Sequence, residues 1–198
     1  MIISALKQTS PENITVIFED GSEVRSTLGV ISELRLYAGR DVDENLMEQL
    51  CSLSVRYLSL GKAIEVVSRR QMSGKELHDK LLLKGMDDNT ADFCVAKLTD
   101  LGFINEEEYA LAIVRHYSAK GYGAARIRSE LIRRGINREL QESAIEQIPE
   151  SSEKIDNYIA SHLKDSSDNK EIKKITDALF RRGFSWEEIS KAIRRYNE

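Results

Sequence analysis

The chain has 198 residues, of which 41% are hydrophobic and 31% are charged, and its formal net charge is −4 at pH 7. The overall acidity argues against a protein that coats DNA through bulk charge, and no apolar run is long enough to span a membrane. Because the N-terminus lacks the basic and long apolar segments of a signal peptide, we expect a protein of the cytoplasm with one or two domains. In that compartment Cys51 and Cys94, which form no motif, are expected to be reduced and to pack.

Residues 1–45 are predicted to form a small β-containing extension that caps the helical part of the chain. Residues 14–18 (ITVIF) are rich in β-formers and are followed by an Asp-Gly turn signal, so residues 24–28 are the predicted return strand. A further short β segment is predicted at residues 34–37. A long helix is then expected to begin near Asp43 and to run toward Arg70. A hairpin of this size needs packing against a neighbour to be stable.

One short pattern occurs three times along the rest of the chain. It reads LLLKGMD at residues 81–87, LIRRGIN at 131–137 and LFRRGFS at 179–185. The glycines of successive copies lie 50 and 48 residues apart. A period of this size is typical of repeat proteins, in which each unit buries its core against its neighbours. The repeat therefore favours an extended binding surface over a single enzymatic cleft.

Each copy is interpreted as the end of one helix and the start of the next. In the second copy Leu131 is expected on the apolar face, and Arg134 complements the negative end of the helix. Gly135 fits the position just beyond the helix end, where the backbone is often left-handed. Ile136 then folds back onto the helix, and Asn137 caps the next one. If φ at Gly135 is positive, we expect Gly135→Ala to cost roughly 1 kcal/mol. The equivalent residues are Leu81, Lys84, Gly85, Met86 and Asp87 in the first copy and Leu179, Arg182, Gly183, Phe184 and Ser185 in the third.

Helical runs precede and follow every junction, so each repeat is predicted to hold three helices. The capping-box spacing of Ser73 and Glu76 marks the start of the middle helix of the first repeat. The predicted fold is mainly α, with three tandem three-helix repeats that form an elongated, curved stack after the β-containing extension. The predicted boundaries of the repeats are residues 46–105, 106–150 and 151–198.

Charge is segregated along the chain. Residues 86–108 hold seven acids and one base, residues 115–138 hold seven bases and one acid, and residues 170–195 hold eight bases and four acids. Arg126 and Arg133 are seven residues apart and share a helix face, and arginine suits bidentate recognition of carboxylate or phosphate. One interpretation is an anionic partner, either nucleic acid or an acidic protein surface. Solvated helix faces are the alternative.

No arrangement of residues in the sequence predicts catalysis. Each histidine is predicted to be isolated within a helix, without a second ligand at metal-binding spacing: His78, His116 and His162. The Ser73-Gly74-Lys75 run is similar to the end of a phosphate-binding loop, but Arg69 stands where that loop needs a glycine. Trp186 is predicted to anchor the core of the last repeat. We therefore expect no enzyme activity, no metal and no cofactor.

Three segments resemble the family of RecX regulatory proteins. They are residues 98–110 (LTDLGFINEEEYA), residues 120–136 (KGYGAARIRSELIRRGI) and residues 63–81, which contain SRRQMSGKEL. The resemblance extends over about residues 55–196. The family usually has two aspartates where this chain has Asn105 and Glu106, and the N-terminal β segment is similar to an extension carried by some longer members.

This resemblance implies a modulator of the RecA recombinase that acts in recombination, DNA repair and the SOS response. RecX-like proteins bind RecA and its filament on single-stranded DNA, lodge in the filament groove, and restrain ATP hydrolysis and strand exchange. The implied partners are RecA and single- or double-stranded DNA, bound by a monomer without a cofactor. The candidate contact residues are all basic: Lys120, Arg126, Arg128, Arg133, Arg134, Lys173, Lys174, Arg181, Arg182, Arg194, Arg195, Arg69 and Arg70.

Other interpretations stay open at this point. The chain could be a nucleic-acid-binding module that acts without RecA, in which case about four phosphate contacts predict a log–log salt slope of roughly −3 on single strands. It could also be a helical scaffold for another acidic protein. For Lys84, Arg134 and Arg182 the alternative role is complementation of a helix end only.

Overall fold

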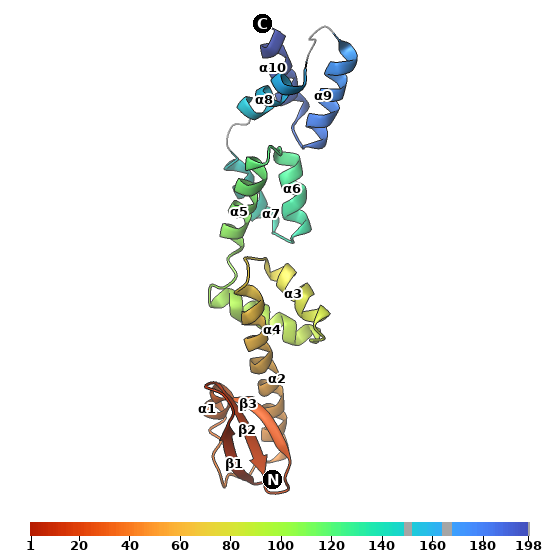
Figure 1. The fold of residues 1–198 in the computed structure, drawn as a ribbon. Helices are drawn as coiled ribbons and strands as arrows, with labels where there is room; N and C mark the ends of the chain where they lie inside the picture. The colour runs from red at the N-terminus through yellow and green to blue at the C-terminus, as the bar shows by residue number, and fades with distance from the viewer. Residues whose placement is uncertain (149–151, 164–167, 198) are drawn as a thin grey trace. The chain divides into compact units, whose positions relative to one another are not determined.

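The computed structural model describes residues 1–148, 152–163 and 168–197 (Figure 1). It divides into two compact units, one made of Met1–Gln71 and Leu77–Ile104 and the other of Met72–Glu76 and Asn105–Glu198. The described residues form three strands and ten helices, and none of these helices is long and apolar enough to cross a membrane. The prediction of a mainly α fold with a small β-containing N-terminal extension is confirmed.

The first unit begins with an antiparallel sheet in the order β1-β2-β3. Val16 and Phe18 of the central strand are 0% and 2% exposed and share one core with apolar residues of the first two helices. The predicted hairpin is confirmed, and the Asp43 side chain accepts the Leu46 N–H at 2.8 Å to start the long helix as expected. These elements are β1 (Ile3–Gln8), β2 (Asn13–Phe18), β3 (Glu23–Thr27), α1 (Leu28–Glu33) and α2 (Glu44–Val67).

The prediction of a strand at residues 34–37 is wrong. Leu34 is the C-cap of α1, and the Leu36 N–H donates to the Ile31 carbonyl at 2.9 Å, which closes the helix with a turn. Arg35 adopts a left-handed φ of 51° within this turn. Strand β1 was not predicted, because its sequence ISALKQ holds few β-formers and its conformation depends on pairing with β2.

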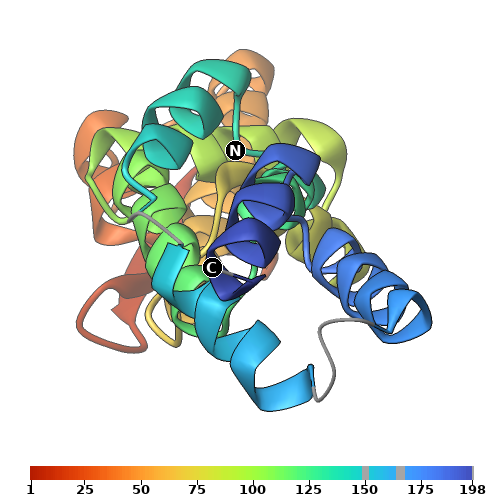
Figure 2. The same cartoon turned by 90° about the horizontal axis from the view of Figure 1, so that it is seen from above.

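The other helices follow in sets of three. In the second repeat Ile127, Leu131 and Ala144 lie in one core, and in the third repeat, drawn in blue and seen from above in Figure 2, Ile155 and Leu179 lie in another. Repeat 1 contains α2, α3 (Gly74–Leu83) and α4 (Asp88–Asp100). Repeat 2 contains α5 (Glu106–Ala119), α6 (Ala124–Arg133) and α7 (Arg138–Glu146), and repeat 3 contains α8 (Ser152–His162), α9 (Asn169–Arg181) and α10 (Trp186–Asn197).

The recurring helix junctions have the predicted geometry. The junction glycines have φ values of 84°, 76° and 91° at Gly85, Gly135 and Gly183. Asp87 and Asn137 accept N–H bonds as N-caps of α4 and α7, and Ser185 forms a reciprocal capping box with Glu188. Gly102 and Gly121, with φ of 75° and 76°, lie outside the recurring pattern but also adopt the left-handed conformation after a helix, and at Gly121 the sequence predicted a turn between two helices.

Two of the junction glycines also allow a close approach between successive repeats. A Cβ on Gly135 would lie 2.6 Å from Lys75 Cβ at the start of α3, and a Cβ on Gly183 would lie 2.7 Å from Arg126 Cβ at the start of α6. At the second of these contacts the Gly123 N–H donates to the Arg182 carbonyl at 2.9 Å. By contrast, nothing lies within 4 Å of a Cβ built on Gly85. In both cases the first turn of a middle helix packs against the junction glycine of the following repeat: α3 against Gly135 and α6 against Gly183.

The prediction that Trp186 anchors the core is wrong, because this side chain is 67% exposed. Trp186 is the first residue of α10, and side chains at a helix start lean toward the N-terminus, beyond the packed face. Phe184 and Ile189, 3% and 0% exposed, fill the core at this place. A large aromatic ring is therefore left on the surface of the third repeat.

The two cysteines differ in their surroundings. Cys94 on α4 is fully buried, and burial raises the pKa of its thiol to about 11. It packs as expected and stays protonated at neutral pH. Cys51 on α2 is exposed, so the expectation of a packing role does not hold for this residue.

Candidate partner-binding surface

Arg134 lies at the centre of a polar network inside the second unit. Its Nε donates to Glu130 Oε1 at 2.7 Å, and its Nη1 donates to the hydroxyl of Tyr109. That hydroxyl in turn donates to Glu76 Oε2 at 2.7 Å. The backbone carbonyl of Arg134 also accepts a hydrogen bond from Ser73 Oγ. Arg134 thus ties the start of α3 to the second repeat, and its charged group is occupied within the protein.

The network perturbs the ionisation of its members in consistent directions. Hydrogen bonds from Arg133 and Arg134 hold the pKa of Glu130 at about 2, although burial of this carboxylate opposes that shift. Burial lowers the pKa of Arg134, but its bonds to Glu130 and Tyr109 outweigh that effect and raise it. Burial and the Glu76 carboxylate raise the pKa of Tyr109. Glu130 and Arg134 are therefore both charged at neutral pH, as a buried pair must be to satisfy its hydrogen bonds.

Three further arginines of α6 are exposed, Arg126 and Arg133 on one side of the helix and Arg128 on another. Arg133 is 67% exposed at its side chain, although its Nε and Nη2 donate to Glu130 at 3.0 and 2.6 Å. Arg126 and Arg128 are exposed and have no ion pair or side-chain hydrogen bond among the described residues. The guanidinium groups of Arg126 and Arg128 are therefore uncompensated, and that of Arg133, although paired with Glu130, is exposed enough to contact a ligand as well.

Helix α9 repeats this arrangement in the third repeat. Lys174 and Arg181 occupy the positions of Arg126 and Arg133 relative to the junction glycine, nine and two residues before it, and both are exposed. Lys173 is exposed beside Lys174. The following base, Arg182, is half-buried, and its guanidinium lies 4.7 Å from the centre of the Tyr158 ring. The guanidinium group of Arg182 is therefore engaged by contacts within the protein, as that of Arg134 is.

An apolar position on the same two helices was missed by the sequence analysis. Directly after the buried leucine of each junction stands a large apolar residue that faces water: Ile132 is 58% exposed and Phe180 is 65% exposed. The equivalent Leu82 of α3 is 38% exposed. The sequence signal was a second apolar residue after each leucine, at a place where a helix surface is usually polar. We use the term α6–α9 surface for the exposed bases and apolar side chains of these two helices.

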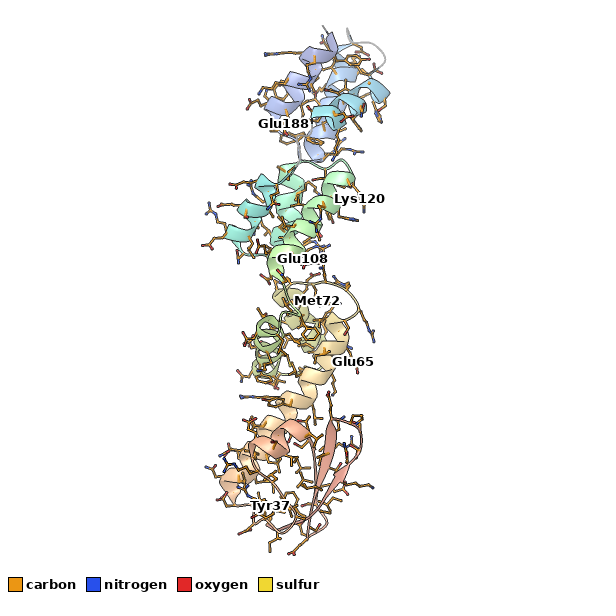
Figure 3. The ribbon with its side chains drawn as sticks, turned by 90° about the vertical axis from the view of Figure 1, so that its left-hand side faces the viewer. Tyr37, Glu65, Met72, Glu108, Lys120 and Glu188 are labelled. Atoms are coloured by element: carbon orange, nitrogen blue, oxygen red, sulfur yellow. The ribbon has the colours of Figure 1, made fainter. Side chains whose placement is uncertain are left out.

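The remaining candidates lie on other elements. Lys120 is exposed at the end of α5 and is labelled in Figure 3. Arg194 and Arg195 lie in the last turn of α10, where Arg195 Nη2 pairs with Asp156 Oδ1 at 2.8 Å. Arg69 and Arg70 are exposed just after α2, in the other compact unit.

For His78 the prediction of an isolated histidine is wrong. The α3–α4 junction brings Asp88 and Asp92 to it, and each carboxylate has an oxygen 3.3 Å from His78 Nε2. The two aspartates are 75% and 68% exposed, whereas the His78 side chain is only 22% exposed. This arrangement fits an ion pair between neighbouring helices when the imidazole is protonated. The cluster could not be predicted from spacing in the sequence, because its members lie on two different helices, α3 and α4.

Comparison with known proteins gives consistent matches. A family profile described as the second three-helix domain of RecX matches residues 105–145, and one described as the third three-helix domain of RecX matches residues 159–193. The regulatory protein RecX of Caldanaerobacter subterraneus subsp. tengcongensis is 30% identical over 131 residues, which are 66% of each chain. That of Xanthomonas axonopodis pv. citri is 32% identical over 136 residues, which are 67% of this chain and 84% of the relative.

Solved structures share the fold. A crystal structure of a regulatory protein RecX superposes with a TM-score of 0.84 at 18% identity and covers 96% of this chain and 98% of its own. The crystal structure of RecX from Lactobacillus salivarius superposes with a TM-score of 0.65 at 24% identity over 72% of this chain and 97% of its own. The matched relatives are thus named as regulatory proteins and not as enzymes.

Proposed function

The chain belongs to the RecX family, and on that premise we propose that it binds the RecA recombinase and its filament on single-stranded DNA. The proposed effect is to restrain ATP hydrolysis and strand exchange by RecA, in the cytoplasm. The observation that carries the proposal is the α6–α9 surface, on which two repeats present the same combination of exposed bases and one apolar side chain. A surface repeated in register suits a partner whose own subunits repeat.

We assign the proposed contacts by what each base already does. Arg134 and Arg182 are occupied within the protein, so they position their repeats and leave recognition to other residues. Arg126 and Lys174 are exposed at equivalent positions and are the strongest candidates. Arg133 and Arg181 extend the same faces by two helical turns. The other proposed contacts are Lys120, Arg128, Lys173 and Arg194, whereas Arg195 shares its charge with Asp156.

The chemistry of these side chains indicates the kind of group that they bind. Guanidinium groups bind carboxylates and phosphates through paired N–H donors, and a lysine binds either as a point charge. The apolar side chains of Ile132 and Phe180 between such bases favour a protein surface with an acidic and apolar character. An effect on ATP hydrolysis would then arise in RecA, through the contacts that this surface makes.

An ATPase assay with purified cognate RecA on single-stranded DNA tests the proposal. We expect the protein to slow hydrolysis, and the double variant Arg126→Glu, Lys174→Glu to need roughly tenfold more protein for the same effect. The control is Arg115→Glu, Arg138→Glu, which changes the net charge equally on α5 and α7. If wild-type protein in stoichiometric excess has no effect on RecA, the proposed function is wrong.

A second candidate is binding to single-stranded nucleic acid without RecA. It is favoured by Phe180 and Trp186, two of the exposed aromatic rings of the third repeat, because bases stack on such rings where a basic surface holds the backbone. Trp186 is the single tryptophan of the chain, so its fluorescence reports on this place directly. Quenching by an oligonucleotide with a log–log salt slope of roughly −3 would support this function, and no binding would remove it.

The third interpretation, a scaffold for another acidic protein, uses the same surface. Affinity capture from the native lysate separates it from the first proposal. Recovery of RecA, weakened by the Arg126→Glu, Lys174→Glu variant, favours the first proposal. Recovery of a different acidic protein, with RecA absent, favours the scaffold.

A further inference from the structure

The first unit contains a groove of about 970 Å³ that the α6–α9 surface does not include. One wall is the C-terminal half of α2, on which Glu65 is labelled in Figure 3, and the other is the end of α3 with the junction that leads into α4. All the residues that line it belong to the same compact unit. A volume of this size accommodates a short peptide segment.

The rim of this groove is basic. Five of its lining residues are bases and two, Glu65 and Asp87, are acids. Asp87 is engaged as the N-cap of α4, and its bonds from the Thr90 hydroxyl and N–H hold the pKa of its carboxyl below the usual value. The five bases are Lys62, Arg69, Arg70, Lys80 and Lys84. Among the described residues, Lys62, Arg69, Lys80 and Lys84 have no carboxylate within ion-pair distance.

Two of the lining residues are apolar and exposed. Leu83, at the end of α3, is 88% exposed, and Val55 on α2 is 53% exposed. Leu83 stands where the other two repeats have Arg133 and Arg181, so the first repeat replaces a base by a leucine at this position. Together Leu83 and Val55 give this groove an exposed apolar contact area among its bases, which a partner side chain could cover.

We propose that this groove binds an acidic peptide segment of a partner protein, with one apolar side chain of the peptide placed against Leu83 and Val55. Carboxylates on either side of that side chain would reach Lys62 and Arg69 on one wall and Lys84 on the other. Charge complementarity with the five lining bases favours an anion, and the exposed side chains of Leu83 and Val55 favour a peptide over a phosphate backbone, which has no aliphatic side chain to place against them. No aromatic residue lines the groove on which a base could stack.

The groove belongs to the first unit and the α6–α9 surface to the second; the groove includes Arg69 and Arg70 of the candidate RecA contacts, but the inference does not depend on RecA being the partner. The test is fluorescence anisotropy with the full-length protein and a labelled peptide in which leucine is flanked by runs of glutamate. Four unlabelled competitors separate the contributions: the leucine–glutamate peptide itself, the same peptide with serine for leucine, the same peptide with glutamine for glutamate, and a short thymidine oligonucleotide. We expect the leucine–glutamate peptide to compete best.

Variants locate the binding on the protein. We expect Leu83→Ser and Lys84→Glu each to weaken peptide binding by roughly tenfold, because each removes a direct contact. The controls are Leu101→Ser, at a leucine 54% exposed at the end of α4, and Lys97→Glu, earlier on the same helix. Leu83 is exposed, so Leu83→Ser should leave the thermal unfolding temperature nearly unchanged, whereas Lys84→Glu should lower it by roughly 2–4 °C because Lys84 complements the negative end of α3.

Each outcome decides the matter. Peptide binding that both groove variants weaken and both controls preserve supports the proposal. No peptide binding at millimolar concentration overturns it. Binding that depends on Lys84 and equally on Lys97, but not on Leu83, overturns it in favour of non-specific charge attraction. If the oligonucleotide binds better than the peptide and Leu83→Ser has no effect, the groove is a phosphate site.

Discussion

Gly135→Ala tests whether the second junction glycine serves only its own turn or also the contact with the preceding repeat. Gly121→Ala is the matched control, because both glycines have a φ of 76° and both lie in the second compact unit. They differ in what a Cβ would meet. At Gly121 the nearest atom is the flexible end of Arg182 at 3.4 Å, whereas at Gly135 it would meet Lys75 Cβ at 2.6 Å and Cγ at 3.0 Å.

The expected costs follow from these distances. A left-handed alanine costs roughly 1–2 kcal/mol, and the reduced freedom of the unfolded chain returns about 0.4–1 kcal/mol, so Gly121→Ala should destabilise by about 1 kcal/mol. Gly135→Ala carries the same terms and must also displace the backbone-anchored Cβ of Lys75. Overpacking of this kind adds roughly 1–3 kcal/mol, for a total of about 2–4 kcal/mol. The backbone conformation alone would account for roughly 1 kcal/mol of that.

Urea denaturation followed by circular dichroism gives the free energy of unfolding, and amide hydrogen exchange of α5–α7 assigns the loss to the second unit. Gly85→Ala, with nothing within 4 Å of the added Cβ, serves as a further control in the first unit. If Gly135→Ala costs no more than Gly121→Ala, the close approach of α3 to this junction does not contribute to stability, and the reasoning fails.

The remaining predictions concern the buried polar network and the cysteines. Glu130→Gln should destabilise the protein by roughly 2 kcal/mol, whereas Glu142→Gln, at a 54% exposed partner of a surface ion pair, should change stability by less than about 1 kcal/mol. Because the pKa of Glu130 is held at about 2 in the folded protein against an ordinary 4.5, its contribution is complete above pH 4.5 and is lost as the pH falls toward 2. A stability–pH profile in which wild type and Glu130→Gln stay equally far apart down to pH 2 would contradict this. Tyr109→Phe should cost roughly 1–2 kcal/mol in thermal or urea unfolding, since its hydroxyl joins two charged groups; a neutral effect would mean that the network does not need it. A thiol reagent at pH 8 should label Cys51 rapidly and Cys94 only after unfolding; equal labelling in the folded protein would show that Cys94 is accessible.

Features that depend on neighbours in the chain could be predicted from the sequence. Gly135 adopts a positive φ because it directly follows Arg134, the C-cap of α6, where a helix commonly ends in a left-handed residue. Asn137 caps α7 because its side chain reaches an N–H three residues later. These interactions span only a few residues, so a short motif contains all the participants. The same holds for the helix face shared by Arg126 and Arg133, since 3.6-residue periodicity places them together.

Features that depend on contacts between residues far apart in the chain could not be predicted from the sequence. Strand β1 exists because β2 pairs with it, and its own six residues do not show it. Arg134 contacts Tyr109 and Glu76, which lie 25 and more residues away in the chain. The sequence therefore suggested Arg134 as a partner contact, whereas in the structure its guanidinium group binds within the protein. Trp186, just after the third N-cap, was predicted to anchor the core, and the direction of its side chain at the helix start makes it exposed instead.

For this protein the amino-acid pattern was sufficient for the repeat, its junctions and the RecX family, because each is encoded by residues close together in the chain. Packing in the folded protein determines which bases remain available to a partner. Arg134 and Arg133 donate hydrogen bonds to Glu130, while Arg126 and Lys174 stay exposed. The groove beside Leu83 likewise exists only because α2 and the α3–α4 junction meet in space. Charge can be counted along a chain, but its availability depends on what surrounds it after folding.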